Sequence, residues 1–136
     1  MPNAELEERT RSILVDYAAK LAAFGSAEAI ALHLAGREVK AWCGESNRCA
    51  LADDLTKTLV ENGVLPYSVE VGGDFMVYLT LRGARDEIWV VHSISEVADE
   101  FIERYDDGAF PDLIHPDDAN GLKKAREFET ERELSY

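Results

Sequence analysis

Residues 46–63, SNRCALADDLTKTLVENG, form the stretch around which the rest of the chain is organised. Apolar residues recur there at spacings of three, three and four, which places them on one side of a helix: Cys49, Ala52, Leu55 and Leu59. The Ser46 hydroxyl can accept from a free backbone N–H of the first turn, and Gly63 is typical of the residue after a helix end. The pattern predicts an amphipathic helix, with Asp53 and Asp54 on its polar side.

Several segments around this helix have the alternation of β-strands. Strands are expected at 38–43, 67–71, 74–81 and 87–93. The third of these has apolar residues on both faces, which is typical of a central strand in a small sheet. Gly72-Gly73 predicts a tight hairpin turn that uses the positive φ of glycine, and residues 82–86 close a second hairpin.

Other segments have helical periodicity. Helices are expected over 4–24 and 27–35, with Gly36 stopping the second, and from the Ser93–Glu96 capping-box spacing to Gly108. The predicted fold is α+β, a small antiparallel sheet of three or four strands packed with about four helices. We expect one domain over residues 1–115 and a charged segment over 116–136 that is helical or partly disordered.

Composition limits the classes of function. The net charge is −13, and residues 95–118 hold nine acidic residues against one arginine, which gives −8 there. No basic patch is present to neutralise phosphates, so direct binding to nucleic acid is not expected. No apolar run has the length of a membrane span and the charged N-terminus is not a signal peptide, which predicts a cytoplasmic protein that binds no membrane. Two cysteines, Cys43 and Cys49, are too few for a disulfide scaffold, so free thiols are expected.

The acidic stretch supplies the leading functional hypothesis. Ile94, Ala98, Phe101 and Tyr105 would hold its helix on the core, and the carboxylates between them must then point outward. This arrangement predicts a non-catalytic interaction module that binds a protein partner with a basic surface, and a phage or accessory origin is our hypothesis for it. The candidate binding residues are Asp99, Glu100, Glu103, Asp106, Asp107 and Asp112. A solvated face that only keeps the protein soluble is the simpler interpretation, and oligomeric state is left open.

A cysteine hydrolase is the alternative. A thiolate in the first turn of a helix is stabilised by free N–H groups, as in papain-like and transglutaminase-like cores. Cys49 would be the nucleophile, His92 its base, and Asp74 stands where such cores place a histidine. Cys49 also shares the apolar stripe of its helix, which favours a structural thiol, so we favour no catalytic residues.

No metal site or cofactor is predicted. The histidines have no metal-ligand spacing to one another or to both cysteines. Residues 116–127 match a calcium loop at Asp118, Asn120, Gly121 and Glu127, but Pro116 occupies the position of the first aspartate ligand and the match is a coincidence.

Two motifs together resemble a known group. SNRCALADDL, followed about fifty residues later by SISEVADEFIERYDDGAFPDLI, resembles small uncharacterised proteins of high-GC actinobacteria and their phages. The resemblance covers residues 26–114, and Ala50 stands where proline is common in that group. The resemblance implies the same architecture, and it supplies no information on activity.

Overall fold

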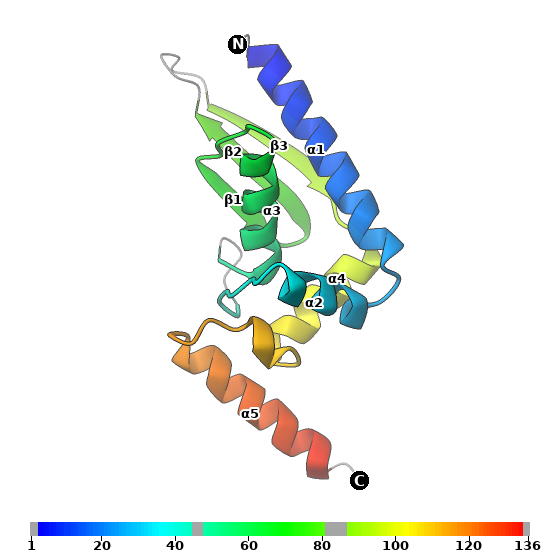
Figure 1. Ribbon diagram of the computed structural model, residues 1–136, viewed down its shortest axis with the longest axis vertical. Coiled ribbons are helices and arrows are strands. Elements are labelled where there is room, and N and C mark those ends of the chain that lie inside the picture. The colour runs from blue at the N-terminus through cyan, green and yellow to red at the C-terminus, as the bar shows by residue number, and fades with distance from the viewer. Residues whose placement is uncertain (1–2, 45–47, 81–86, 135–136) are drawn as a thin grey trace.

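The computed structural model describes residues 3–44, 48–80 and 87–134, and its elements are shown in Figure 1. In chain order they are α1 (Asn3–Ala23), α2 (Ala27–Gly36), α3 (Ala50–Glu61), β1 (Ser68–Val71), β2 (Asp74–Thr80), β3 (Glu87–Ser93), α4 (Glu96–Asp106), the 3-10 helix η1 (Pro111–Leu113) and α5 (Ala119–Leu134). The fold is α+β, as predicted.

The sheet has the antiparallel order β1-β2-β3, so β2 is central as expected. Val77 lies opposite Val69 on one side and Val90 on the other, and all three point to the same face. That inner face is buried under α3, which packs on β1, and α1, which packs on β3. The ring of Tyr17 in α1 meets that of Phe75 in β2 edge-on at 5.6 Å. One hydrophobic core therefore lies between the helices and one side of the sheet.

The predicted strand at 38–43 is replaced by a single bridge. Ala41 pairs in parallel with Ile114, and its N–H donates to the Leu113 carbonyl at 2.8 Å. Glu38 has φ +59, a conformation that interrupts an extended segment. The sheet therefore has three strands among the described residues, and 38–43 instead ties the segment after α2 to η1.

The central helix begins later than predicted. Residue 46 lies outside the described residues, and α3 starts at Ala50 with Cys49 as its N-cap. Its C-terminal boundary is as expected, because Asn62 is the C-cap and Gly63 follows with φ +80. The predicted polar side was wrong at Asp54, which is only 1% exposed.

Two local signals were assigned to the wrong residue, and the β1–β2 turn lies at Gly72-Gly73 as predicted but in another conformation. The N-cap of α4 is Ser95, whose side chain accepts from the Ala98 N–H, while Ser93 is the last residue of β3. Helix α2 runs through Gly36 to the C-cap Arg37. The four described glycines with positive φ do not include Gly72 or Gly73, so the β1–β2 turn does not use the predicted conformation. The proposed 82–86 turn lies outside the described residues.

The C-terminal segment forms a helix at the end of the molecule opposite the N-terminus (Figure 1). Asp118 anchors α5, because one carboxylate oxygen accepts from the Gly121 N–H and the other accepts from the Cys43 N–H, both at 3.0 Å. Gly108 lies directly against the α5 backbone, since a Cβ added there would stand 2.6 Å from the Ala125 nitrogen. The Asp118 contact with Gly121 is a helix cap.

Candidate functional site

Helix α4 presents the candidate binding residues. Its inner stripe, Ala98, Phe101 and Tyr105, is buried. The acidic side chains that point away from the core are exposed, and with Asp112 from η1 we call them the α4 acidic surface: Asp99, Glu100, Glu103, Asp107 and Asp112. Their outward direction is confirmed.

Aromatic packing holds α4 in place. The Phe101 ring stacks on Tyr105 at 5.9 Å and on Phe110 at 5.3 Å, which joins the helix to the segment after it. The Tyr105 hydroxyl donates to the Leu113 carbonyl at 3.3 Å, and burial raises the pKa of this tyrosine. Arg104 pairs with Glu28 of α2. The acidic surface is therefore mounted on a rigid element rather than on a loop.

Asp106 differs from the other predicted acidic residues. It is half-buried, and its carboxylate accepts from the Gly44 N–H at 2.8 Å. The expectation that Asp106 points outward was wrong, because its carboxylate is used to hold the segment before α3. Its role is structural, and the α4 acidic surface does not include it.

Cys49 is buried, with 4% of its surface exposed, and it forms the N-cap of α3 in an extended conformation. Burial raises the pKa of its thiol to about 11, although the backbone N–H groups of Leu51 and Ala52 lower it. The predicted stabilisation by the helix start is thus present, but desolvation outweighs it. A thiol with this pKa is almost entirely protonated at neutral pH, which is the state of a structural cysteine.

The other two residues of the hydrolase alternative lie elsewhere on the sheet. His92 is half-buried on β3, opposite Phe75, and Asp74 is exposed at the start of β2, opposite Ser93. Cys49 is the N-cap of α3, which packs on β1, whereas β3 packs against α1. A nucleophile and its base need hydrogen-bond contact, and the structure places Cys49 and His92 on different elements of the fold.

A buried polar cluster was missed by the sequence analysis. The Asp54 carboxylate accepts from the Tyr17 hydroxyl at 2.7 Å and from the Arg37 guanidinium at 2.5 Å. Arg37 also binds Glu61 at 2.7 Å, so the cluster joins α1, the end of α2 and both ends of α3. The Arg37 hydrogen bonds lower the pKa of Glu61, and burial followed by the Asp54 charge raises the pKa of Tyr17. A signal existed, because Asp54 follows the buried residues Ala50 and Leu51 by one turn.

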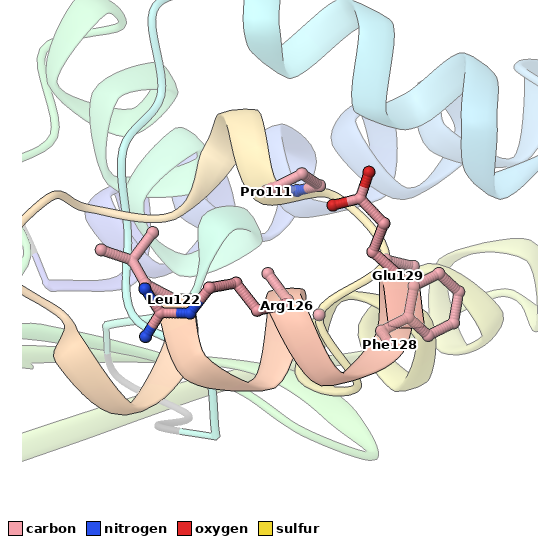
Figure 2. A pocket seen from close by; sticks show the side chains of 8 residues that line it. Pro111, Leu122, Arg126, Phe128 and Glu129 are labelled. Atoms are coloured by element: carbon pink, nitrogen blue, oxygen red, sulfur yellow. The ribbon is translucent and has the colours of Figure 1, made fainter. Parts of the chain in front are cut away.

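A hollow of about 330 Å³ lies between α5 and the segment that carries η1. Pro111, Leu122, Ala125 and Phe128 form its apolar wall, and Figure 2 shows the Glu129 side chain reaching from α5 toward Pro111. The lining contains no nucleophile or histidine. It does not connect Cys49, His92 or Asp74.

Within ranges 3–44, 48–80 and 87–134, no group of three or more His, Cys, Asp or Glu residues could hold a metal ion. In the same ranges, no helix is both long enough and apolar enough for a transmembrane segment. Both Cys43 and Cys49 are free thiols, as predicted. Comparison with known proteins found no matching family model, no matching curated protein and no matching solved structure.

Proposed function

We propose that this protein is a non-catalytic interaction module, and that its α4 acidic surface binds a protein partner with a basic surface. The proposal assigns it to the cytoplasm and excludes nucleic acid as the ligand, since the net charge of −13 repels phosphates. A phage or accessory origin agrees with the sequence resemblance.

One observation carries the proposal. Asp99, Glu100 and Glu103 are all exposed on a helix whose opposite side is buried. Carboxylates crowded in this way repel one another and destabilise the monomer, so a cationic partner gains by relieving the repulsion. The ion pairs found in the described part of the chain lie elsewhere and leave these three carboxylates available to a partner.

Charge reversal tests the proposal. Complementary charge mainly accelerates association, and added salt screens it over about 10 Å. Glu100→Lys/Glu103→Lys should therefore slow the association of a partner isolated from the native host and remove most of its salt dependence. Surface plasmon resonance with the purified partner measures the association rate and its salt dependence.

The matched control is Glu5→Lys/Glu8→Lys, which makes the same change in net charge on exposed positions of α1. It should alter the association rate much less. If both double variants have equal effects, the partner senses only the overall charge and the α4 acidic surface is not its site.

A further inference from the structure

The outer face of the sheet carries a second surface of different chemistry. Strand residues alternate between faces, and the buried Val69, Val77 and Val90 define the inner one. Their neighbours point to the opposite side, which we call the outer face: Glu70, Asp74, Met76, Tyr78, Trp89 and Val91. The described part of the chain leaves Trp89 48% and Val91 43% exposed. A large part of this apolar surface is therefore open to a partner.

An aromatic row crosses the outer face. Tyr67, which precedes β1 and is 72% exposed, meets the Tyr78 ring at 5.3 Å, and Tyr78 meets the Trp89 ring at 4.7 Å. The row thus spans all three strands. Tyrosine and tryptophan are the residues that most often dominate the binding energy of protein interfaces, because they give a large rigid contact area. Contiguous exposed apolar surface of this kind is typical of an interaction site.

The size of the outer face fits one helix. Strands lie about 4.8 Å apart, so the outer two strands are separated by about 10 Å, and seven residues of strand extend about 23 Å. An α-helix is about 10–12 Å wide and covers that length with about 15 residues. A helix on the outer face would complete a layered arrangement, since α1 and α3 already cover the inner face.

Charge identifies the helix further. Residues 64–80 and 87–93 contain neither lysine nor arginine, and Glu70 and Asp74 flank the β1–β2 turn. The chain passes from β3 directly into α4, whose first turn holds Glu96 and Asp99. One end of the outer face is therefore acidic and its centre is apolar. A complementary ligand has an apolar stripe and basic residues toward that end.

Other occupants fit less well. Nucleic acid would bring phosphates onto a face whose described residues include acidic and no basic side chains. A second copy would bring together two chains that each have a net charge of −13, with Glu70 and Asp74 on both contacting faces, so the two copies would repel each other. Helix α5 lies at the other end of the molecule from the sheet, as Figure 1 shows.

We propose that the outer face docks one amphipathic helix of a protein partner, with its apolar stripe on the Tyr67–Tyr78–Trp89 row and lysine or arginine near Asp74. This inference adds a second surface and the secondary structure of the ligand to the proposed function. The outer face can bind its ligand whether or not the α4 acidic surface has a partner, and separate variants test the two surfaces.

A synthetic probe tests the inference. The peptide has 16 residues, with leucine at helical i, i+3, i+4 and i+7 spacing and lysine elsewhere, and fluorescence anisotropy measures its binding. A matched peptide has glutamate in place of lysine. The lysine peptide should bind, and ¹⁵N NMR of the wild-type protein should show shifts at Met76, Val91 and the Trp89 indole. The Trp42 indole, stacked on His115 at 4.3 Å, is the internal reference.

Variants locate the binding. Trp89→Ser should lower the affinity of the protein for the lysine peptide at least tenfold. Leu32→Ser, at a 76% exposed position on α2, should leave it unchanged. If Trp89→Ser also changes the fold, the NMR shifts of the wild-type protein still decide the site.

Four results would overturn the inference. The first is equal binding of the glutamate peptide, and the second is a set of shifts that lie only on α4 and disappear in Glu100→Lys/Glu103→Lys. The third is a dimer of the free protein that Trp89→Ser dissociates, which would assign the outer face to a second copy. The fourth is a 20-nucleotide thymidine strand that quenches Trp89 and displaces the peptide. Loss of binding in Trp89→Ser but not in Glu100→Lys/Glu103→Lys would support the outer face even if the α4 acidic surface has no partner.

Discussion

Asp54 connects three helices through a single carboxylate, which accepts from Tyr17 and from Arg37. Sequence patterns treat aspartate as a surface residue, because burial of an isolated carboxylate is costly. Its partners lie 37 and 17 residues away, so local spacing does not reveal them. Cys49 shows another limit of sequence patterns. Its burial could be predicted from the apolar stripe, but its position as the N-cap could not, because that position depends on where α3 begins.

Replacing Asp54 by alanine should destabilise the protein by about 3 kcal/mol, because the Tyr17 hydroxyl loses its acceptor and Arg37 loses a buried partner. Urea unfolding measures the change. Asp53→Ala is the matched control, since Asp53 makes a partly exposed pair with Lys57 and should cost about 0.5 kcal/mol or less. Equal losses in the two variants would show that the cluster adds nothing to stability.

Cys49 should react slowly with iodoacetamide in the folded protein and quickly after unfolding, because its thiol is buried and protonated. The half-exposed Cys43 should be labelled first, and mass spectrometry of peptides distinguishes the two. His92→Ala should leave both rates unchanged. Rapid native labelling of Cys49 that depends on His92 would instead support the hydrolase alternative.

The same thiol predicts a loss of stability in alkali. The pKa of the Cys49 thiol is raised in the folded state from 9.0 to about 11. The contribution of the protonated thiol to the free energy of unfolding is therefore complete below pH 9 and is lost as pH rises toward 11. The difference in unfolding free energy between wild type and Cys49→Ala should therefore shrink over that interval. A difference that stays constant from pH 8 to 11 would contradict the raised pKa.

At the scale of elements, periodicity predicted most helices and strands, whereas glycine marked the end of α3 but not the end of α2. The α3 stop at Gly63 and the exact span of β3 follow from glycine conformation and strand alternation. Starts were less certain, because Ser93 and Ser95 are both acceptable caps and the end of β3 decides between them. Segment 38–43 alternates like a strand, but it does not join the sheet, and Ala41 pairs with Ile114 instead.

Leu55 should be a central contributor to the stability of α3, because its side chain is completely buried against the sheet side of the core. Leu55→Ala should cost about 2–5 kcal/mol by thermal or urea unfolding. Leu65→Ala, the same substitution at an 80% exposed position, should stay within about 0.5 kcal/mol. A small effect at residue 55 would contradict the packing of α3.

At the scale of the whole molecule, the sequence indicated the class of fold and the outward acidic residues of α4. It did not indicate the open aromatic face, because Met76, Tyr78 and Trp89 look like ordinary strand residues until the position of every helix is known. It also left open the conformation of residues 116–136, for which Leu122, Ala125 and Phe128 were the expected apolar contributors. The structure places a helix there, of which Ala125 alone among these three is buried.

Removing residues 119–136 should change stability by only about 1–2 kcal/mol, since α5 contributes the buried Ala125 and the partly buried Leu122 to the core. Gly108→Ala should lower the stability of both the full and the truncated chain, because residue 108 has φ +89. The loss of stability should be larger in the full chain, because only there does the added Cβ also collide with α5. Melting temperatures of the four proteins measure the coupling. Equal costs in both backgrounds would show that residue 108 does not hold α5.

The close approach of Gly108 to α5 has a consequence for the history of such a chain. Backbone atoms form the contact on the α5 side, at Lys124 and Ala125, so the contact does not select for any particular exposed side chain of the helix. Gly121 is constrained by a side chain, because a Cβ there would stand 2.1 Å from the Asp118 carboxylate, which is held by the Cys43 N–H. In descendants of this protein, the outward residues of α5 are therefore free to diverge while these two glycines and Asp118 persist. Among such descendants, sequence identity would fall first along the outward side of α5, while Gly108, Asp118 and Gly121 would stay aligned.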